Sequence, residues 1–336
     1  MKFLTTAATA LALSVTASAA LADPAGCDAG EMVIKFSHVT NTDKHPKGIA
    51  AELLKTRVNE QMDGKACMEV YPNSTLYDDD KLLEAMLQGD VQLGAPSLSK
   101  FETFTKVFRI FDLPFMFKNM EAVDAFQASD NGQAMMSSME RRGLAGLGFW
   151  HNGLKQFSAN KPLLEPEDAK GLKFRVQPSD VLVAQMEALG ASPQKMAFSE
   201  VYGALQQGVV DGQENTWSNT LGQKYYEVQD GITETNHGVL DYMVVASVDW
   251  LDSLDEGTRD QFLEILDGVT KERNAAIAQV DADARQGVLD AGGVIRELTP
   301  EQRADWVAVM KPVWDQFTDD VGQDNIDAAQ AINAQF

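Results

Sequence analysis

Four polar side chains lie where predicted strands end, which is where an open α/β sheet binds its ligands. His38 ends the first predicted strand, and Ser97 lies just past the third. Arg175 is near the end of the first strand of a second α/β unit, and Asn215 follows a short strand at Val209-Val210. If the two units face each other, these four side chains meet in one interdomain cleft.

Arg175 is the side chain best suited to bind an anion. Its planar guanidinium can hold a carboxylate through two parallel hydrogen bonds. A surface arginine or an interdomain salt bridge would fit the same pattern. Asn215, in the run Asp211-Gly-Gln-Glu-Asn, could donate an amide hydrogen bond to the same carboxylate, although Asp, Gly and Asn also favour plain turns.

Further candidates could complete such a site. Lys47 and Lys155 are cations for a second acidic group, and His38 could bind a ligand oxygen. Phe157 and Trp217 could wall the pocket. The alternatives are solvated lysines, a structural histidine and aromatic rings that only pack in the core.

The sequence gives little support to an enzyme. It contains no G-x-S-x-G, no G-x-G-x-x-G and no P-loop pattern. Its four histidines are scattered, and Asp78-Asp79-Asp80 lacks the spacing of a calcium loop. We therefore expect no catalytic residues, no cofactor and no bound metal. The net charge of −22, with 50 acidic and 28 basic residues, argues against binding to nucleic acid or to anionic membranes.

The chain reads as two α/β units followed by a helical tail. The first unit has strand signals at 32–39, 68–71 and 91–95 with helices between them, which is a β-α-β-α-β pattern and indicates a parallel sheet. The second begins with the alternating run 171–176. A further strand is predicted at 242–248, one long helix or two joined helices at 256–291, and a last helical region from Thr299-Pro300.

The N-terminus is typical of an exported protein. Lys2 precedes a short apolar run that leads to Ala20-Leu21-Ala22, which predicts a signal peptide over residues 1–22 that is cleaved near Ala22. Only two cysteines occur, Cys27 and Cys67, and in an oxidising compartment we expect them to form a disulfide. The alternatives are two free thiols, or a lipid on Cys27.

Several long motifs resemble the solute-binding proteins of TRAP transporters, over essentially the whole mature chain. They are Lys35-Phe-Ser-His38, Tyr71-Pro-Asn-Ser74, Ala95-Pro-Ser97, Trp150-His-Asn-Gly153, Gly171-Leu-Lys-Phe-Arg175-Val-Gln, Gly190-Ala-Ser-Pro193, Met196-Ala-Phe-Ser-Glu-Val-Tyr-Gly-Ala-Leu-Gln206 and Val210-Asp-Gly-Gln-Glu-Asn215. The region of His38 and Pro46-Lys-Gly48 is similar to the C4-dicarboxylate (DctP) branch.

The resemblance implies a two-domain periplasmic binding protein of type II-like fold, each domain a mainly parallel sheet flanked by helices, with a long connecting helix. The expected domains are 23–152 with 241–280, and 153–240 with 281–336. Arg175 and Asn215 take the positions of the family's ligand-binding arginine and asparagine. The implied partners are a small organic acid such as succinate, fumarate or malate, and the TRAP membrane permease; no direct membrane insertion is expected.

One departure from the family pattern bears on the ligand. Thr216-Trp217 replaces the usual proline after Gln-Glu-Asn, so a bulky Trp217 could change the size of the pocket. Three alternatives therefore stay open: a binding protein for a keto, sugar or aromatic acid, a binding protein that serves a sensor, and a periplasmic enzyme.

Overall fold

A computed structural model describes residues 27–336, so the predicted signal peptide lies outside the described residues. The described strands are β1 (Met32–Ser37), β2 (Ala66–Tyr71), β3 (Leu93–Gly94), β4 (Leu144–Ala159), β5 (Lys173–Val176), β6 (Ser192–Lys195), β7 (Gly212–Asn215), β8 (Gly231–Ser247) and β9 (Ile295–Glu297).

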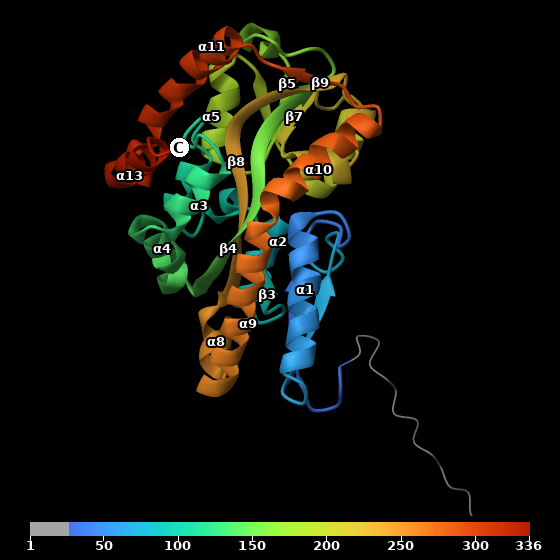
Figure 1. Ribbon diagram of the computed structural model, residues 1–336, viewed down its shortest axis with the longest axis vertical. Coiled ribbons are helices and arrows are strands. Elements are labelled where there is room, and N and C mark those ends of the chain that lie inside the picture. The colour runs from blue at the N-terminus through green and yellow to red at the C-terminus, as the bar shows by residue number, and fades with distance from the viewer. Residues whose placement is uncertain (1–26) are drawn as a thin grey trace, which may run out of the picture.

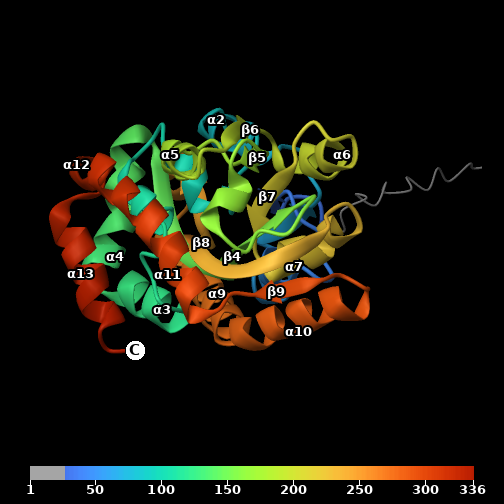
Figure 2. The same cartoon turned by 90° about the horizontal axis from the view of Figure 1, so that it is seen from above.

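Helices lie on both faces of these strands (Figures 1 and 2). The α-helices are α1 (Pro46–Gln61), α2 (Asp79–Leu87), α3 (Met120–Ala128), α4 (Asp130–Met136), α5 (Asp180–Ala188), α6 (Val201–Gln206), α7 (Trp217–Gly222), α8 (Val248–Ser253), α9 (Glu256–Ala275), α10 (Ile277–Asp290), α11 (Pro300–Met310), α12 (Thr318–Val321) and α13 (Gln323–Asn333). Short 3-10 helices are η1 (Leu98–Phe101), η2 (Val107–Phe111), η3 (Ser137–Arg142), η4 (Pro166–Ala169), η5 (Phe198–Glu200), η6 (Tyr225–Glu227) and η7 (Lys311–Gln316). Of the helices in 27–336, none is both long and apolar enough to cross a membrane.

Both predicted parallel units are present, but they belong to one mixed sheet. Within the described residues the order is β2-β1-β3-β8-β4-β7-β5-β6, with β9 beside β8, which makes nine strands. The sets β2-β1-β3 and β6-β5-β7 are parallel. Strands β4 and β8 run antiparallel to each other between the two sets and join them (Figure 1). Each half therefore has the expected mainly parallel set of strands, and β4 and β8 connect the two sets into one continuous sheet.

The long strands β4 and β8 pass from one half of the molecule to the other. Trp150 belongs to the same buried cluster as Phe36 and Leu54 of the first half, whereas Phe157, seven positions later on β4, packs with Phe174 of the second half. Between these points the β4–β8 register shifts from Trp150 to Gly153, and Gly153 has a φ of 145°, which favours glycine.

The helical tail follows the second of the two alternatives predicted for residues 256–291, which was two joined helices. The predicted helix at 256–291 is two helices, because α9 ends before Ala276 and α10 begins after it. Helix α9 lies beside α1 on the first half (Figure 1). Helices α12 and α13, at the C-terminal end of the chain, place Val321 and Ile326 in the same buried cluster as Phe111 and Phe126.

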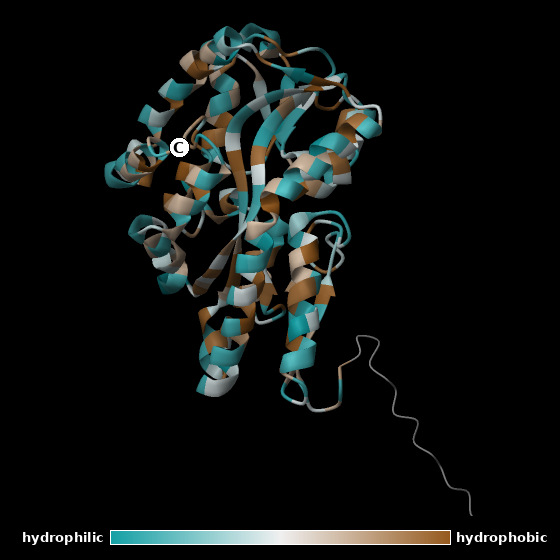
Figure 3. Cartoon of the chain, in the orientation of Figure 1, coloured by the Kyte–Doolittle hydropathy of each residue, from teal (hydrophilic) through white to brown (hydrophobic). Residues whose placement is uncertain are grey.

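The distribution of hydropathy agrees with this layered arrangement. In Figure 3 the strands β4 and β8 carry apolar segments where helices cover them, and the outer helices mix hydrophilic and apolar residues along their length. Buried apolar clusters fill both halves of the molecule. The sheet and its cover thus form a scaffold that fixes the strand ends.

The predicted strand at Val209-Val210 is wrong by a few residues. Val209 is 52% exposed in a turn after α6, and the strand is β7, which begins at Gly212 and ends at Asn215. The two β-branched valines suggested a strand, but Gly208 with a φ of 68° turns the chain there. Asn215 is consequently the last residue of the strand and does not merely follow it.

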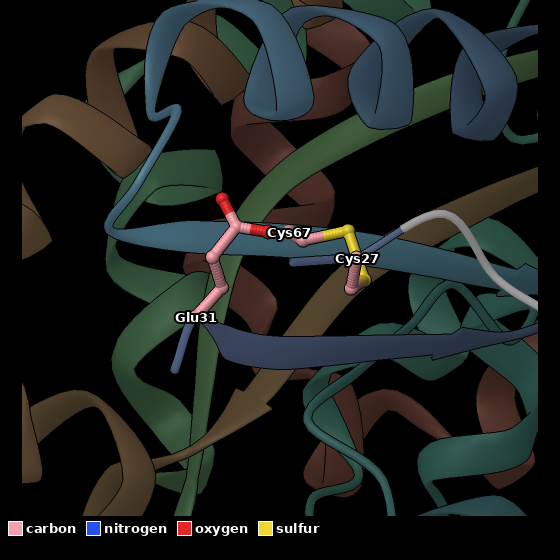
Figure 4. Close-up of side chains that lie close together, drawn as sticks. All are labelled: Cys27, Glu31 and Cys67. Carbon is pink, nitrogen blue, oxygen red and sulfur yellow. A yellow bond between two sulfur atoms is a disulfide. The ribbon is translucent and has the colours of Figure 1, made fainter. Parts of the chain in front are cut away.

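Cys27 and Cys67 form a disulfide at the edge of β2 (Figure 4). Glu31 lies beside them and accepts hydrogen bonds from the backbone of Asp28 (2.7 Å) and of Gly64 (2.9 Å). Because both sulfurs are already bonded to each other, this group is a structural clamp on the N-terminal segment and has no free thiolate for a metal.

Candidate functional site

A cavity lies between the two halves of the sheet, at the carboxyl ends of its parallel strands. The side chains around it enclose about 330 Å³ of space between protein atoms, part of it open to solvent. Its lining residues are Val39, Thr40, Lys47, Asp79, Ser97, Lys100, Arg175, Gln177, Phe198, Asn215, Asn219, Leu240 and Tyr242. Of the predicted site residues, the structure brings Arg175, Asn215, Lys47 and Ser97 together here.

Arg175 lies on β5 and is almost completely buried. Its Nε and Nη2 donate hydrogen bonds to the backbone oxygen of Met196, at 3.1 and 3.0 Å. Burial lowers the pKa of Arg175, but an arginine stays protonated in proteins. Within residues 27–336 no carboxylate forms an ion pair with it. The guanidinium is therefore held in one orientation with its charge unmatched by an adjacent acid.

Asn215 is held in a chain of amide hydrogen bonds. Its Nδ2 donates to Oε1 of Gln213 (2.9 Å), and its Oδ1 accepts from Nδ2 of Asn219. Oδ1 of Asn219 is 2.6 Å from Nε2 of His45, which lies at the start of α1. These bonds tie the end of β7 to the first half of the molecule and fix the orientation of both asparagines beside the cavity.

Lys47 enters the cavity from the first turn of α1 and is fully buried. Its Nζ donates to the backbone oxygen of Ala95 (3.0 Å) and lies 3.9 Å from Oδ2 of Asp79. The same ammonium is 4.0 Å from the centroid of the Tyr242 ring, a cation–π contact. Burial lowers the pKa of Lys47, and the charge of Asp79 opposes that effect.

The cavity carries an excess of positive charge. Lys47, Lys100 and Arg175 line it, against the single carboxylate of Asp79. Lys100 forms an ion pair with Asp80, whose side chain is exposed and does not line the cavity. In a chain of net charge −22 this local surplus selects anions, because a buried anion needs cations and donors around it.

Ser97 connects the two sides of the cavity. It follows β3, and its Oγ donates a hydrogen bond to Oε1 of Gln177, which follows β5. Ser97 also forms a β-bridge with Tyr242. The cavity is thus bounded by polar groups from both halves that are already bonded to each other.

Two of the predicted residues lie elsewhere, in polar surroundings. His38 is buried beside the cavity but does not line it, and its Nδ1 accepts from the backbone of Thr40 (3.3 Å). Burial, and then the charge of Lys47, lower the pKa of His38 to about 3, so the ring is neutral at physiological pH. Lys155 is fully buried and pairs with Glu214 (2.9 Å) and Asp112 (3.8 Å).

Phe157 and Trp217, the two aromatic residues predicted to line the cavity, also pack away from it. The ring of Phe157 stacks on that of His237, with centroids 3.8 Å apart. Trp217 is buried with Val288, and the guanidinium of Arg285 lies 5.7 Å from its ring. Since Trp217 is not a lining residue, replacing the family's proline by Thr216-Trp217 does not put the indole into the cavity.

The sequence analysis missed several lining residues. Gln177 stands two positions after Arg175, and Asn219 stands four after Asn215, so both were within reach of the motifs already selected. Asp79 and Lys100 come from the start of α2 and from η1. No sequence pattern near Tyr242 indicated a binding residue, because Tyr242 reaches the cavity only through the pairing of β8 with β3 of the first half.

Comparisons of this chain with a family model and with known proteins point to the same family. The family model described as DctP, bacterial extracellular solute-binding protein, family 7, matches residues 36–320. The C4-dicarboxylate-binding periplasmic protein DctP of Vibrio cholerae is 65% identical over 325 residues, which are 97% of this chain and 98% of that protein. The protein of the same description from Shewanella loihica is 52% identical and covers 89% of each chain.

Solved structures agree with these relatives. A TRAP periplasmic solute-binding protein from Shewanella oneidensis with bound succinate superposes with a TM-score of 0.89 and 51% identity, over 90% of this chain and 99% of that one. One from Pseudomonas aeruginosa with bound L-malate has a TM-score of 0.83 and 44% identity, over 85% and 99%.

Proposed function

Because the chain belongs to the bacterial extracellular solute-binding protein family 7, we propose that it captures a C4-dicarboxylate in the periplasm for a TRAP transporter. The observation that carries the proposal is the buried Arg175, which lines the cavity together with Lys47 and forms no ion pair with a carboxylate in the described part of the chain. Two cations on opposite halves match a short ligand with a carboxylate at each end. The relatives that bind succinate and L-malate support this ligand class.

In the proposed complex each carboxylate has its own partners. One carboxylate binds the Arg175 guanidinium and the Asn215 amide. The other binds Lys47 and lies beside Ser97, whose single hydroxyl proton is donated to Gln177. Arg175 is already oriented by the Met196 carbonyl, so the ligand does not have to order it.

Binding is proposed to close two domains, 23–152 with 241–280 and 153–240 with 281–336. Arg175 and Asn215 belong to the second and Lys47 and Ser97 to the first, so a ligand contacts all four only when the domains approach. Such a ligand shifts the population towards the closed form. The register shift of β4 against β8 at Gly153 is the proposed bending point.

Four further proposals complete the function. The chain is exported and cleaved near Ala22, and it delivers its ligand to the TRAP permease subunits in the membrane. It performs no catalysis, so the bound acid should be recovered chemically unchanged. Mass spectrometry of ligand released after incubation checks this last point, and a modified product would contradict it.

The test is calorimetry and thermal shift of the mature protein, from Asp23 onward, with succinate, fumarate, L-malate and the monocarboxylate butyrate. We expect the three dicarboxylates to bind and raise the melting temperature, and butyrate to leave it unchanged. The variant Arg175→Ala should lose about 2–5 kcal/mol of binding free energy. Arg141→Ala, which removes an exposed arginine, is the control. Near-native affinity in Arg175→Ala would refute the assignment.

A further inference from the structure

One acceptor in the cavity has no donor of its own. Asp79 is 8% exposed and lines the cavity from the first residue of α2. Its Oδ2 is 3.9 Å from the Lys47 ammonium, beyond hydrogen-bond distance, and its Oδ1 has no hydrogen-bond partner among residues 27–336. Burial raises the pKa of this carboxyl, which agrees with a group that lacks donors.

The other lining side-chain oxygens already have partners. The Thr40 hydroxyl is 3.1 Å from Nδ1 of His38, and the Tyr242 hydroxyl accepts from Asn152 (2.8 Å). The remaining partnered oxygens are those of Ser97 with Gln177, Asn215 with Asn219, and Asn219 with His45. Asp79 Oδ1 therefore differs from the rest of the lining, because no donor among residues 27–336 is bonded to it and a ligand in the cavity can supply one.

A dicarboxylate dianion without other polar groups has no donor to offer Asp79. A hydroxyl on the carbon chain between the carboxylates supplies one. An ammonium at the same place would also donate, but Lys47, Lys100 and Arg175 line the cavity and repel a further positive charge. The same three cations favour the ionised form of both ligand carboxyls over a protonated one.

We propose that Asp79 is a specificity residue that accepts a hydrogen bond from the hydroxyl of a hydroxylated C4-dicarboxylate of the malate type. The proposal rests on the proposed function, since it adds one contact to a site that binds both carboxylates. The contact makes the site prefer L-malate to succinate, because succinate leaves the buried Oδ1 without a donor. Hydrogen bonds to charged groups are worth enough to give about tenfold or more in affinity.

The experiment is calorimetry at pH 7 with succinate, L-malate and L-aspartate on four proteins: the wild type, Asp79→Ala, Asp79→Asn and Asp63→Ala. The N-cap residue Asp78 is intact in all of them, so α2 keeps its start. Asp63 is exposed, and its removal controls for the loss of one negative charge.

We expect the wild type and Asp63→Ala to bind L-malate at least about tenfold more tightly than succinate. Asp79→Ala should bring the two affinities to within about twofold, and Asp79→Asn should keep part of the preference because its amide oxygen still accepts. A purely electrostatic role would raise both affinities in both variants and leave their ratio unchanged.

Three outcomes would overturn the proposal. They are equal affinity of the wild type for the two acids, an unchanged ratio in Asp79→Ala, and tighter binding of L-aspartate than of L-malate. If the wild type binds neither dicarboxylate, the proposed function fails as well. Binding of both with an unaltered ratio in the variant refutes only the role of Asp79.

Discussion

The hydroxyl of Ser97 donates a hydrogen bond to Oε1 of Gln177, so a residue that follows β3 is tied to one that follows β5. Both line the cavity, and each belongs to a different half of the molecule. The bond therefore exists only while the two strand ends are close together.

We expect the variants Ser97→Ala and Gln177→Ala to weaken ligand binding mainly by speeding release. A neutral hydrogen bond contributes about 0.5–1.5 kcal/mol, which corresponds to a moderate loss of affinity. Stopped-flow or surface plasmon resonance measures the dissociation rates. The double variant should lose less than the two single losses added together, because both changes remove one bond. Strictly additive losses would show that the two residues act separately.

Lys155 is expected to stabilise the fold and not to bind the ligand. Its ammonium pairs with the buried Glu214, whose Oε2 is also 2.9 Å from Nε2 of His237. Burial tends to raise the pKa of Glu214, but Lys155 and His237 outweigh it and lower that pKa to about 2. Lys155→Met leaves a buried carboxylate with one partner fewer and should cost about 3–5 kcal/mol in the free energy of unfolding.

Urea denaturation and calorimetry of Lys155→Met test this assignment. The double variant Lys155→Met/Glu214→Gln should recover part of the lost stability, because it removes the unmatched charge while keeping a partner for His237. Ligand affinity should change little in the folded single variant. A large loss of affinity with normal stability would instead return Lys155 to the binding site.

The disulfide should contribute to stability and leave ligand affinity unchanged. Cys67 lies at the start of β2, and the cavity lies at the opposite, carboxyl ends of the parallel strands. The bond closes a loop with a sequence separation of 40. Replacing both cysteines by serine should cost about 2–4 kcal/mol. Chemical denaturation with and without succinate measures both quantities, and a variant of normal stability would contradict the prediction.

His151 should make stability depend on pH above neutrality. Burial lowers the pKa of His151, but Asp241 (2.7 Å) and Asp124 (3.1 Å) outweigh it and raise that pKa to about 10. The folded state then keeps a proton that the unfolded state loses near pH 6.5. The stabilisation is complete below about pH 6.5 and disappears as the pH rises to about 10.

Unfolding of His151→Gln at several pH values checks this sign. The stability difference between the wild type and the variant should be largest at pH 6 and should shrink steadily as the pH rises through 8 and 9. A difference that stays constant over this range would mean that folding does not raise the pKa of this ring.

Much of the site followed from local sequence patterns. Arg175, Asn215, Lys47 and Ser97 lie at the ends of short strands or at the start of a helix, and such ends are visible in the sequence. The parallel units were predictable for the same reason, because β-α-β order determines which strand ends share an edge.

The rest depended on contacts between distant segments. Lys155 and Phe157 lie on β4, whose pairing with β7 and β8 decides what each side chain faces. The sequence around Lys155 does not predict its ion pairs with Glu214 and Asp112. The sequence around Tyr242 likewise does not predict its contact with Lys47. The sequence patterns also did not predict that β4 pairs with β8 and that this pair joins the two units into one sheet.

The sequence by itself thus determined the family motifs, the strand ends and the cations available to hold an anion. The tertiary structure alone decided which cations and acceptors face the cavity. Among residues 27–336 it pairs Lys155 with Glu214 and leaves Arg175 without an ion pair to a carboxylate. The physical reason is that the local sequence pattern determines where a strand or helix begins and ends. The partner of a buried charge is set by segments that come together only when the sheet closes around it.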